Sequence, residues 1–355
     1  MDVGIQMIFA GAGYDGVSDS QVYKEDLELA LRAEELGFDA VWPVEHHFYD
    51  YSMCPDNLEM LAYIAGKTST IGLGTAAIIL PWNDPLRVAE KVAMLDEISD
   101  GRVRMGFGRG LSRREYAHFR GIEMDEARGR FDEAAKLIVD ALETGYMEGD
   151  GEFYPTPRTQ LRPAPTRSFR GRTYSVAGSA DSISICAEIG ARMVMFSEKR
   201  WENRLPGLNE YRDAYQAKFG EAAPPPMTAD FVVCDPDPEL AKELAVEHMT
   251  AYLMSILDHY ELFSDHFKDI KGYRGYGKQS ELLNKIGVEG YVKGFLGANA
   301  FGTPDQILEH FKERRDVLGE YELATCFRFG GLPFDRARSS FELFAAEVLP
   351  ELKRW

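Results

Sequence analysis

The sequence predicts a (β/α)₈ barrel with an insertion or lid after the seventh strand, and three observations support this fold class. First, short apolar runs alternate with helical patterns, about eight of each, which is the count of such a barrel. Second, runs such as 71–80 lack polar alternation, which is typical of parallel strands buried on both faces. Third, 45% hydrophobic and 28% charged residues give an ordinary globular composition that can bury a large core. An open doubly wound sheet is the alternative, although it usually has fewer strands.

The predicted strands are short apolar runs, and nearly all of them are followed by a helical pattern. The first run, 3–10, opens the chain, and the third, 71–80, is rich in Ile and Ala. In chain order we predict strands at 3–10, 38–44, 71–80, 102–108, 173–177, 192–196, 227–233 and 323–329.

The predicted helices combine apolar residues at helical spacing with capping residues at their ends. Gly37 follows the first helix as a stop signal. Asp84 caps the third helix ahead of Pro85, and Thr303 caps a later one. The helix at 126–144 carries an apolar stripe on one side. In chain order the helices are predicted at 23–36, 58–68, 85–98, 126–144, 182–189, 205–219, 238–259, 304–318 and 336–349.

Two stretches show no helical period and are predicted to be irregular. The polar, Pro-rich stretch at 146–172 favours an extended hairpin or loop. The stretch at 261–297 is rich in Gly and Tyr and follows the seventh strand, so we expect it to hang over the barrel mouth as a mobile lid. We expect one domain over 1–355, because α/β barrels often run to this length as a single unit.

The composition argues against several classes of partner. A net charge of −18 is unsuited to nucleic acid or to an anionic membrane surface, since both need clustered Lys and Arg. No run of 18 apolar residues is present, and the start of the chain lacks a basic region and a cleavage site, so we expect neither a membrane span nor a signal peptide. The four cysteines form no C-x-x-C pair and are interpreted as reduced thiols of a cytoplasmic protein.

The end of the second predicted strand carries a candidate for catalysis, because barrels place functional residues at the carboxyl ends of their strands. Glu45, His46 and His47 follow this strand directly, and neighbouring strand residues point to opposite sides. One histidine can therefore face the barrel mouth while the other packs outward. Their spacing differs from that of H-E-x-x-H, so a helical zinc site is not indicated. A role in the site and a pair of hydrogen-bonded structural imidazoles both remain open.

Two further strand ends carry candidates for binding a phosphate. The run Gly106–Gly110 does not match the dinucleotide-binding motif, because the third glycine of that motif is missing. Its glycines would nevertheless let the backbone approach a planar ligand closely. The guanidinium of Arg109 could donate two hydrogen bonds to a phosphate. After the fifth strand, small residues leave backbone N–H groups free at a helix start, and Ser179 and Ser182 add hydroxyl donors. The alternatives are a tight turn with a solvated arginine and plain capping by Ser179 or Asp181.

Several motifs stand in a fixed order along the chain. The first is Glu-His-His-Phe at 45–48, and a Gly-Gly-Leu-Pro motif lies near the end of the chain at 330–333. The others lie at 74–81, 84–90, 95–102, 108–111, 272–277 and 344–350. In order and spacing they resemble the bacterial luciferase-like family of flavin-dependent monooxygenases. The resemblance covers essentially the whole chain and is most specific over 36–130, while 272–277 is similar to the mobile loop of luciferase.

The resemblance implies a (β/α)₈ enzyme that uses reduced FMN and O₂ to oxidise a small, fairly apolar organic substrate. In this family O₂ is activated as a flavin C4a-hydroperoxide, and many members receive reduced FMN from a separate flavin reductase. Family members are often dimers, which implies a homodimer here. By position, His46 matches the histidine that the family uses in flavin chemistry, and an imidazole there can pass a proton at neutral pH.

The resemblance also implies a set of flavin contacts and no metal. Ala76 and Ala77 match a non-proline cis peptide beneath the flavin ring. Luciferase has a reactive cysteine where this chain has Gly108, and its absence argues against light emission with a long-chain aldehyde. Luciferase also has a glutamate where this chain has Gly178. The implied cofactor-binding residues are Thr75, Ala76, Ala77, Arg109, Gly110, Leu111, Ala177, Gly178, Ser179 and Ser182.

Three other functions remain open. Some relatives use the deazaflavin coenzyme F420, for which the same phosphate site would serve, so the chain could be an F420-dependent oxidoreductase. A flavin carrier without activity is the second alternative, against which the intact His46 and Arg109 argue. A metal-dependent barrel hydrolase is the third.

Overall fold

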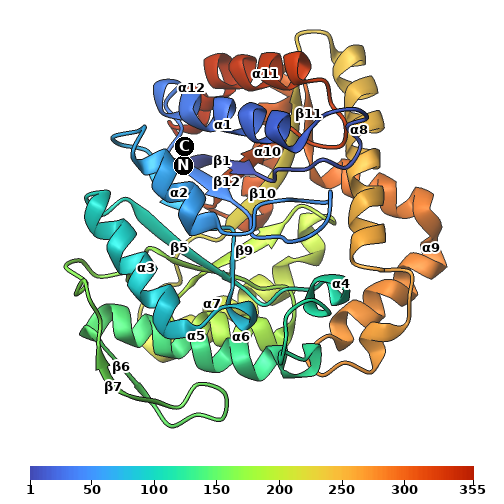
Figure 1. Cartoon of the computed structure of the whole chain (residues 1–355). Helices are drawn as coiled ribbons and strands as arrows, with labels where there is room; N and C mark the ends of the chain where they lie inside the picture. The colour runs from blue at the N-terminus through green and yellow to red at the C-terminus, as the bar shows by residue number, and fades with distance from the viewer.

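Eight parallel strands close into a barrel in the computed structural model, and helices surround it (Figure 1). The structure describes residues 1–355, apart from the side chains of Arg274, Lys278, Gln279 and Leu282. Within these residues β10 closes the ring by pairing with both β9 and β12, which confirms the predicted fold class. The ring follows the order β1 (Val3–Met7), β2 (Ala40–Pro43), β3 (Gly72–Gly74), β5 (Val103–Gly108), β8 (Thr173–Val176), β9 (Arg192–Phe196), β10 (Met227–Cys234) and β12 (Glu322–Cys326).

The helices cover the outside of the barrel and begin at the caps that the sequence predicts. Asp84 accepts the N–H of Arg87 at the start of α3, and Thr303 accepts that of Gln306 at the start of α10. The described helices are α1 (Asp19–Glu35), α2 (Asn57–Ala65), α3 (Pro85–Ile98), α4 (Arg113–Tyr116), α5 (Ala127–Thr144), α6 (Ala180–Glu188), α7 (Leu205–Phe219), α8 (Pro238–His259), α9 (Arg274–Ala298), α10 (Pro304–Leu318), α11 (Phe334–Leu343) and α12 (Leu349–Leu352).

The third predicted strand is divided into short pieces in the structure. β3 ends at Gly74, a cis peptide bond joins Ala76 to Ala77 as the resemblance implied, and β4 (Ile78–Ile79) resumes pairing with β5. The hydroxyl of Thr75 accepts from Gly106 N at 2.7 Å and donates to Gly106 O at 2.9 Å. In a regular parallel ladder the N–H and C=O of Gly106 would bond to backbone groups of the neighbouring strand. Here they bond to the Thr75 side chain instead, so the strand is interrupted at this point.

A layer of side chains fills the barrel interior beneath the carboxyl ends of the strands, and Trp42 is its largest member. The indole packs edge-on against Tyr174, with ring centroids 4.9 Å apart. A Cβ at Gly74 would lie 2.1 Å from Trp42 Cε3, and one at Gly4 would lie 2.5 Å from Trp42 Nε1. The indole thus requires glycine on both neighbouring strands, and this layer is closed to ligands.

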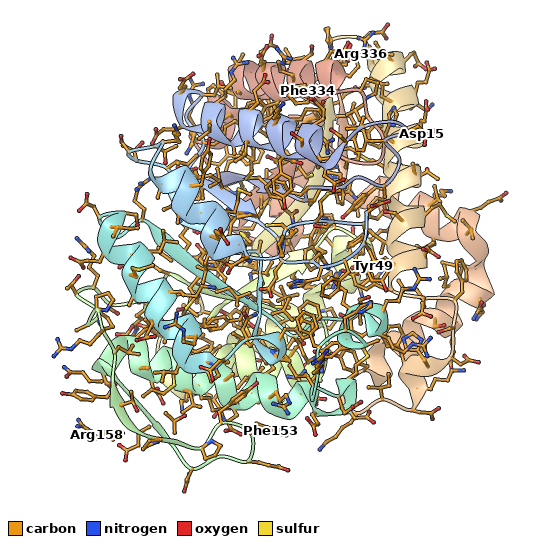
Figure 2. The ribbon with its side chains drawn as sticks, viewed as in Figure 1. Asp15, Tyr49, Phe153, Arg158, Phe334 and Arg336 are labelled. Atoms are coloured by element: carbon orange, nitrogen blue, oxygen red, sulfur yellow. The ribbon has the colours of Figure 1, made fainter. Side chains whose placement is uncertain are left out.

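The polar insertion forms the hairpin that the sequence predicted as one of two options. β6 (Tyr146–Gly149) pairs antiparallel with β7 (Thr156–Gln160). Phe153, between the two strands, and Arg158 lie at the edge of the molecule, away from the barrel (Figure 2). Glu133 of α5 accepts the backbone N–H groups of Phe153 and Tyr154 at 3.0 and 2.6 Å, so the hairpin is fastened to the outside of that helix.

The prediction of an irregular segment at 261–297 is wrong. A 3₁₀ turn spans His266–Lys268, and α9 continues to Ala298 with one non-helical residue, Gly287 (φ 71°). The glycines of this segment obscured the helical period, because Gly is about 1 kcal/mol less favourable than Ala in a helix. Burial of Leu283 and Phe295, together with packing of α9 beside α8 (Figure 1), stabilises the helix despite them.

Three smaller features complete the comparison with the predicted elements. The sequence patterns missed α4 and β11 (Ala300–Gly302), since such short elements leave no period to detect. The predicted last helix is split into α11, a π turn at Phe344–Val348 and α12. The four cysteines are buried and unbridged, and among the described residues no helix is both long and apolar enough to span a bilayer.

Candidate active site

A cavity opens at the carboxyl ends of the barrel strands, where this fold places functional residues. With open solvent included, its empty volume is about 1520 Å³. Of the predicted site residues, its wall contains His46, Ala76, Ala77, Arg109, Gly110, Leu111, Gly178, Ser179 and Ser182.

The two adjacent histidines after β2 point in opposite directions, as predicted. His46 lines the cavity, and its backbone N–H donates to Cys54 O at 3.0 Å. His47 packs outward against Trp82 and Phe119, with ring centroids 5.3 and 5.0 Å away. One imidazole therefore lies at the cavity, and the other packs among aromatic rings on the opposite side.

A buried glutamate that the predicted site did not include lies behind His46. Glu115 on α4 lies 3.1 Å from His46 Nδ1 and 3.3 Å from His259 Nε2. It also accepts the backbone N–H of His47 at 2.6 Å. Burial raises the pKa of this carboxyl, but the charge of His46 and the hydrogen bonds outweigh burial and lower the pKa to about 2. The only local signal is the S-x-x-E pattern, in which Ser112 Oγ accepts the N–H of Glu115 at 3.3 Å.

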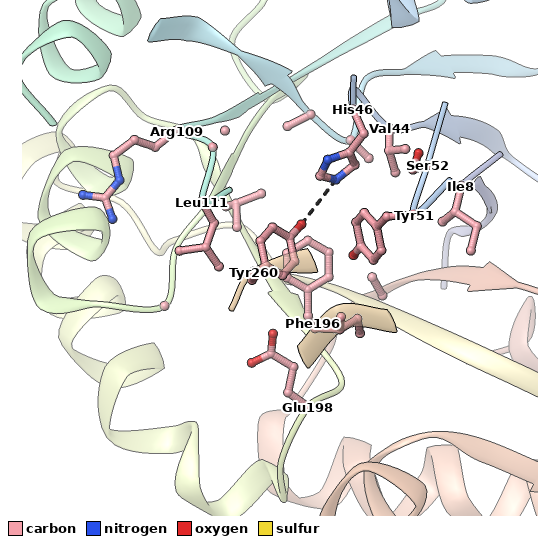
Figure 3. A pocket seen from close by; sticks show the side chains of 18 of the residues that line it. Ile8, Val44, His46, Tyr51, Ser52, Arg109, Leu111, Phe196, Glu198 and Tyr260 are labelled. Atoms are coloured by element: carbon pink, nitrogen blue, oxygen red, sulfur yellow. Dashed lines mark hydrogen bonds between the residues drawn. The ribbon is translucent and has the colours of Figure 1, made fainter. Parts of the chain in front are cut away.

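The cavity side of His46 meets a tyrosine from the end of α8. Tyr260 is the C-cap residue of this helix, and its hydroxyl lies 3.3 Å from His46 Nε2, as the dashed line in Figure 3 shows. Burial raises the pKa of Tyr260 well above its ordinary value, so the phenol keeps its proton. Burial likewise lowers the pKa of His259, whose ring stacks on Tyr51 with centroids 4.3 Å apart.

Two ion pairs fasten the end of α8 to α4. Arg113 donates to Glu261 at 2.6 and 3.1 Å, and Arg114 donates to Asp258 at 3.0 and 3.3 Å. Both pairs are bidentate and lie at the surface, where such pairs contribute modestly to stability. They flank Tyr260 in sequence and join the backbone on both sides of it to α4.

The histidine–carboxylate cluster also offers ligands for a metal ion. One ligand atom each from His46, Glu115 and His259 lies within 4.8 Å of the other two. Two imidazoles and one carboxylate suit zinc or iron(II). No sequence spacing could show this, because Glu115 is 69 residues from His46 and 144 from His259. Hydrogen bonds between the same atoms already satisfy all three groups without an ion.

Two guanidinium groups with unused N–H donors line another part of the wall. Arg109 stacks on Tyr273, 3.9 Å from the ring centroid, and extends away from His46 (Figure 3). Arg128 donates through Nη1 to Asp132 at 3.0 Å. Among the described residues, Arg109 Nη1 and Arg128 Nε and Nη2 are buried and have no hydrogen-bond partner. Unused cationic donors of this kind fit the phosphate of a flavin mononucleotide.

The helix start predicted to bind phosphate is hydrogen-bonded within itself. Ser179 and Ser182 form the capping box of α6. Ser182 Oγ accepts from Gly178 N at 3.1 Å and from Ser179 N at 2.9 Å. Capping and anion binding, the two sequence interpretations, therefore use the same donors. A phosphate here would have to replace Ser182 Oγ as the acceptor of these N–H groups. The backbone at Gly178 is open on its Cβ side, where Arg204 Nη1 at 3.8 Å is the nearest neighbour.

The cis Ala76–Ala77 unit and Gly108 form a tight part of the cavity wall. A Cβ at Gly108 would lie 3.3 Å from Ala77 Cβ, so the cysteine of luciferase would need its neighbours to move. Thr75 and Ala177 lie behind the wall, and each is 1% exposed. These two residues, implied as flavin contacts, support the wall from outside the cavity.

Comparisons with known proteins agree with this geometry. The luciferase-like monooxygenase family matches residues 1–320. The chain belongs to this family. Among the relatives of this luciferase-like chain is the alkanal monooxygenase alpha chain of Photorhabdus luminescens, 28% identical over 340 residues that make up 95% of this chain and 93% of that one. The oxygenase component of flavin-dependent trigonelline monooxygenase from Acinetobacter baylyi is 24% identical over 347 residues, with coverage of 95% and 91%.

Solved structures show the same fold across the luciferase-like chain. A monooxygenase from Streptomyces bottropensis superposes with a TM-score of 0.80 at 24% identity, covering 99% of this chain and 100% of that one. The oxygenating constituent of 3,6-diketocamphane monooxygenase from Pseudomonas putida, solved with FMN, gives 0.72 at 17% identity, with coverage of 99% and 98%. An F420-dependent secondary alcohol dehydrogenase gives 0.71 at 15% identity, with coverage of 98% of both chains. Family membership supports an oxidoreductase with a flavin-type cofactor.

Proposed function

We propose that the chain is a flavin-dependent monooxygenase that uses reduced FMN and O₂ to oxidise a small, fairly apolar organic substrate. The observation that carries this proposal is one cavity that joins the unused guanidinium donors of Arg109 and Arg128 to His46. The two arginines would hold the phosphate of FMN. The small side chains of Ala76 and Ala77 leave the wall flat where a planar ring needs space.

The protein's part in this chemistry is to bind, to exclude water and to move a proton. Reduced FMN, when bound, supplies the electrons that activate O₂, through the C4a-hydroperoxide that the family resemblance implies. Leu262 and Phe295, from the segment after α8, add apolar cover to the cavity. Glu115 holds His46 at Nδ1, so Nε2 remains directed toward the cavity for proton exchange.

The cavity wall supports a fairly apolar substrate. Aromatic side chains from several strands and helices line the same space, among them Phe196, Phe231 and Tyr252. Glu198 adds one carboxylate and lies 3.2 Å from Arg204 Nη2, which balances its charge. A wall of this kind favours burial of apolar surface with few polar contacts.

Mixing chemically reduced FMN with the protein and O₂ tests the proposal. We expect a transient flavin–oxygen absorbance, and labelled oxygen from ¹⁸O₂ in the product when candidate substrates are supplied. His46→Asn should lower turnover by about 10²–10⁴-fold and leave the affinity for FMN unchanged. Failure of the wild-type protein to bind reduced FMN, with oxidation no different from that of free flavin, would refute the proposal.

A second candidate is an F420-dependent oxidoreductase. The F420-dependent dehydrogenase shares the fold with a TM-score of 0.71, and the unused donors of Arg109 and Arg128 suit the phosphate of either cofactor. Titrating tryptophan fluorescence with FMN and with F420 in parallel separates the two candidates. Tight binding of F420 together with no binding of FMN would select this one.

We further propose a cytoplasmic homodimer of single-domain chains that receives reduced FMN from a separate flavin reductase. The trigonelline relative, an oxygenase component by name, supports the separate reductase.

Sedimentation equilibrium tests the dimer. Product formation with a reductase held behind a dialysis membrane tests delivery by diffusion. Hydrogen exchange over 261–297, with and without FMN, tests whether this segment is a mobile lid.

A further inference from the structure

Tyr260 shares the cavity wall with His46 and directs its hydroxyl at the imidazole. Tyr260 and His46 both line the cavity, and 3.3 Å separates the hydroxyl from Nε2 (Figure 3). Tyr252 and Tyr51 also line it, and the Tyr252 hydroxyl donates to that of Tyr51 at 3.3 Å. Tyr51 shares a second side-chain hydrogen bond with Tyr260. Tyr260 therefore joins His46 to a cluster of tyrosines in the cavity wall.

The proton positions in this chain of contacts follow from the carboxylate. An ionised Glu115 can only accept, so the nitrogen that faces it, His46 Nδ1, carries the ring proton. In the neutral ring Nε2 is then an acceptor, and the Tyr260 hydroxyl donates to it. The three groups form an ordered series, from the carboxylate through the imidazole to the phenol.

We propose that Tyr260 is a catalytic residue that relays a proton between the reactant in the cavity and His46, with Glu115 as a positioning residue behind the imidazole. This inference rests on the proposed function and adds a second proton-transfer group to it. The arrangement has the logic of a nucleophile–histidine–carboxylate triad, in which an oriented imidazole accepts a proton from a hydroxyl and a carboxylate stabilises the resulting charge.

The proton transfer balances without any further reagent. In the base direction an O–H or acidic C–H bond of the reactant breaks, and its proton forms a new bond to the Tyr260 oxygen. The original Tyr260 O–H bond breaks at the same time, and its proton forms an N–H bond at His46 Nε2. Tyr260 stays neutral, the reactant becomes an anion, and the imidazolium is balanced by Glu115. The acid direction is the reverse, and no electron is transferred.

The surroundings of the two transfer groups favour a relay over a stable phenolate. The titratable groups that face them include Glu115 from α4, His259 and Tyr252 from α8 itself, and Tyr51 from the loop after β2, which is hydrogen-bonded to Tyr260. None of these is a cation that would hold Tyr260 as an anion, and burial keeps the pKa of the phenol high. Tyr260 therefore passes a proton on without storing charge.

Nitrogen NMR of protein labelled with ¹⁵N-histidine tests the resting arrangement without cofactor, with His46→Asn identifying the resonances of His46. We expect a proton on Nδ1 and an Nε2 shift typical of a hydrogen-bond acceptor. Tyr260→Phe should move the Nε2 resonance toward that of an unbonded imidazole nitrogen. Tyr211→Phe is the matched control, because it removes a buried hydroxyl that donates to Ala191 O at 2.8 Å, outside the site. It should leave the His46 resonances unchanged.

Turnover of the FMN-loaded enzyme tests the catalytic role. Tyr260→Phe should lower kcat by about 100-fold or more with unchanged affinity for FMN, while Tyr211→Phe should retain the wild-type rate. Glu115→Gln keeps the shape of the side chain and should lower kcat as well, because the imidazolium loses its counter-charge. This second variant keeps the test decisive if Tyr260→Phe folds poorly.

Three results would overturn the relay. These are wild-type kcat in a folded Tyr260→Phe protein, a proton on Nε2 of resting His46, and a stoichiometric metal ion held by His46, Glu115 and His259 in the purified protein. If the wild-type protein binds FMN but oxidises nothing, the proposed function fails separately. The relay is then judged by NMR alone, and identical His46 resonances in wild type and Tyr260→Phe would refute it.

Discussion

Two fully buried carboxylates of this molecule are bound by different kinds of partner. Asp230 on β10 is bound by Arg314 of α10 at 2.5 and 2.6 Å, and both side chains are 0% exposed. Glu115 is also 0% exposed, but its partners are two imidazoles, and that of His46 is 16% exposed at the cavity. The partner of Asp230 is permanently charged, whereas the partners of Glu115 are side chains of a type that can gain or lose a proton near neutral pH.

The difference separates a structural role from a chemical one. A guanidinium stays protonated at any ordinary pH, so the Asp230–Arg314 pair can only fix β10 against α10. An imidazole changes charge near neutral pH, so the bonds of Glu115 can hold a ring in place and also stabilise its protonated form. Burial alone does not distinguish the two, but the identity of the partner and its access to a cavity do.

The largest expected effect is on the structural pair. Arg314→Met should lower the free energy of unfolding by about 3–5 kcal/mol, because it leaves Asp230 buried without a counter-charge. Urea unfolding measures this change. The double variant Arg314→Met with Asp230→Leu should recover most of the loss, since apolar replacement of both partners is often neutral. A single variant as stable as the wild type would show that the pair does not bear on stability.

The effect of Glu115 should depend on pH. Folding lowers its pKa from 4.5 to about 2, so the ionised form contributes roughly 3 kcal/mol of stability above pH 4.5 that is lost as the pH falls toward 2. Wild type and Glu115→Gln should therefore differ most in unfolding free energy at neutral pH and converge in acid. Unfolding in urea at several pH values measures this difference, and a constant difference down to pH 2 would contradict the assignment.

Replacing Arg109, whose Nη1 has no hydrogen-bond partner, should change the affinity for FMN rather than the free energy of unfolding. Arg109→Met should raise the dissociation constant of FMN by about 10- to 100-fold, which corresponds to about 1.5–3 kcal/mol for hydrogen bonds to a charged group. Fluorescence titration measures the change. Arg87→Met removes a guanidinium that is 69% exposed and should bind FMN as the wild type does. Equal affinities for both variants would remove Arg109 from the phosphate site.

The smallest expected effect concerns packing without charge. Gly74→Ala should lower the free energy of unfolding by about 1–3 kcal/mol, because its Cβ would lie 2.1 Å from the Trp42 ring. Thermal and urea unfolding measure the loss, and Trp42→Phe in the same chain should restore part of it. Gly294→Ala is the control, since no heavy atom lies within 4 Å of a Cβ there.

The barrel was predictable because each strand and its helix are local patterns. The caps Asp84 and Thr303 and the alternation of His46 and His47 also depend only on neighbouring residues, and the structure confirms them. The helix at 274–298 was missed because its glycines mask its period, and only packing against α8 reveals it.

The partners of His46 could not be predicted from the sequence, for a different reason. Glu115 and Tyr260 meet His46 across 69 and 214 residues, and no local pattern encodes such a distance. Arg109 was found because it follows a strand within a glycine-rich run, yet its stacking on Tyr273 comes from a segment 164 positions later. Local sequence patterns thus identify candidate residues, and only the three-dimensional fold shows which of them lie side by side.

The indole at the centre of the barrel restricts how this chain can change over generations. Gly4, Trp42 and Gly74 sit on three adjacent strands and share one volume, so a change at any one of them alters what the other two tolerate. A lineage that gains a side chain at position 74 would have to shrink the residue at 42 in step. Substitutions at these three positions should therefore occur together among relatives of this chain.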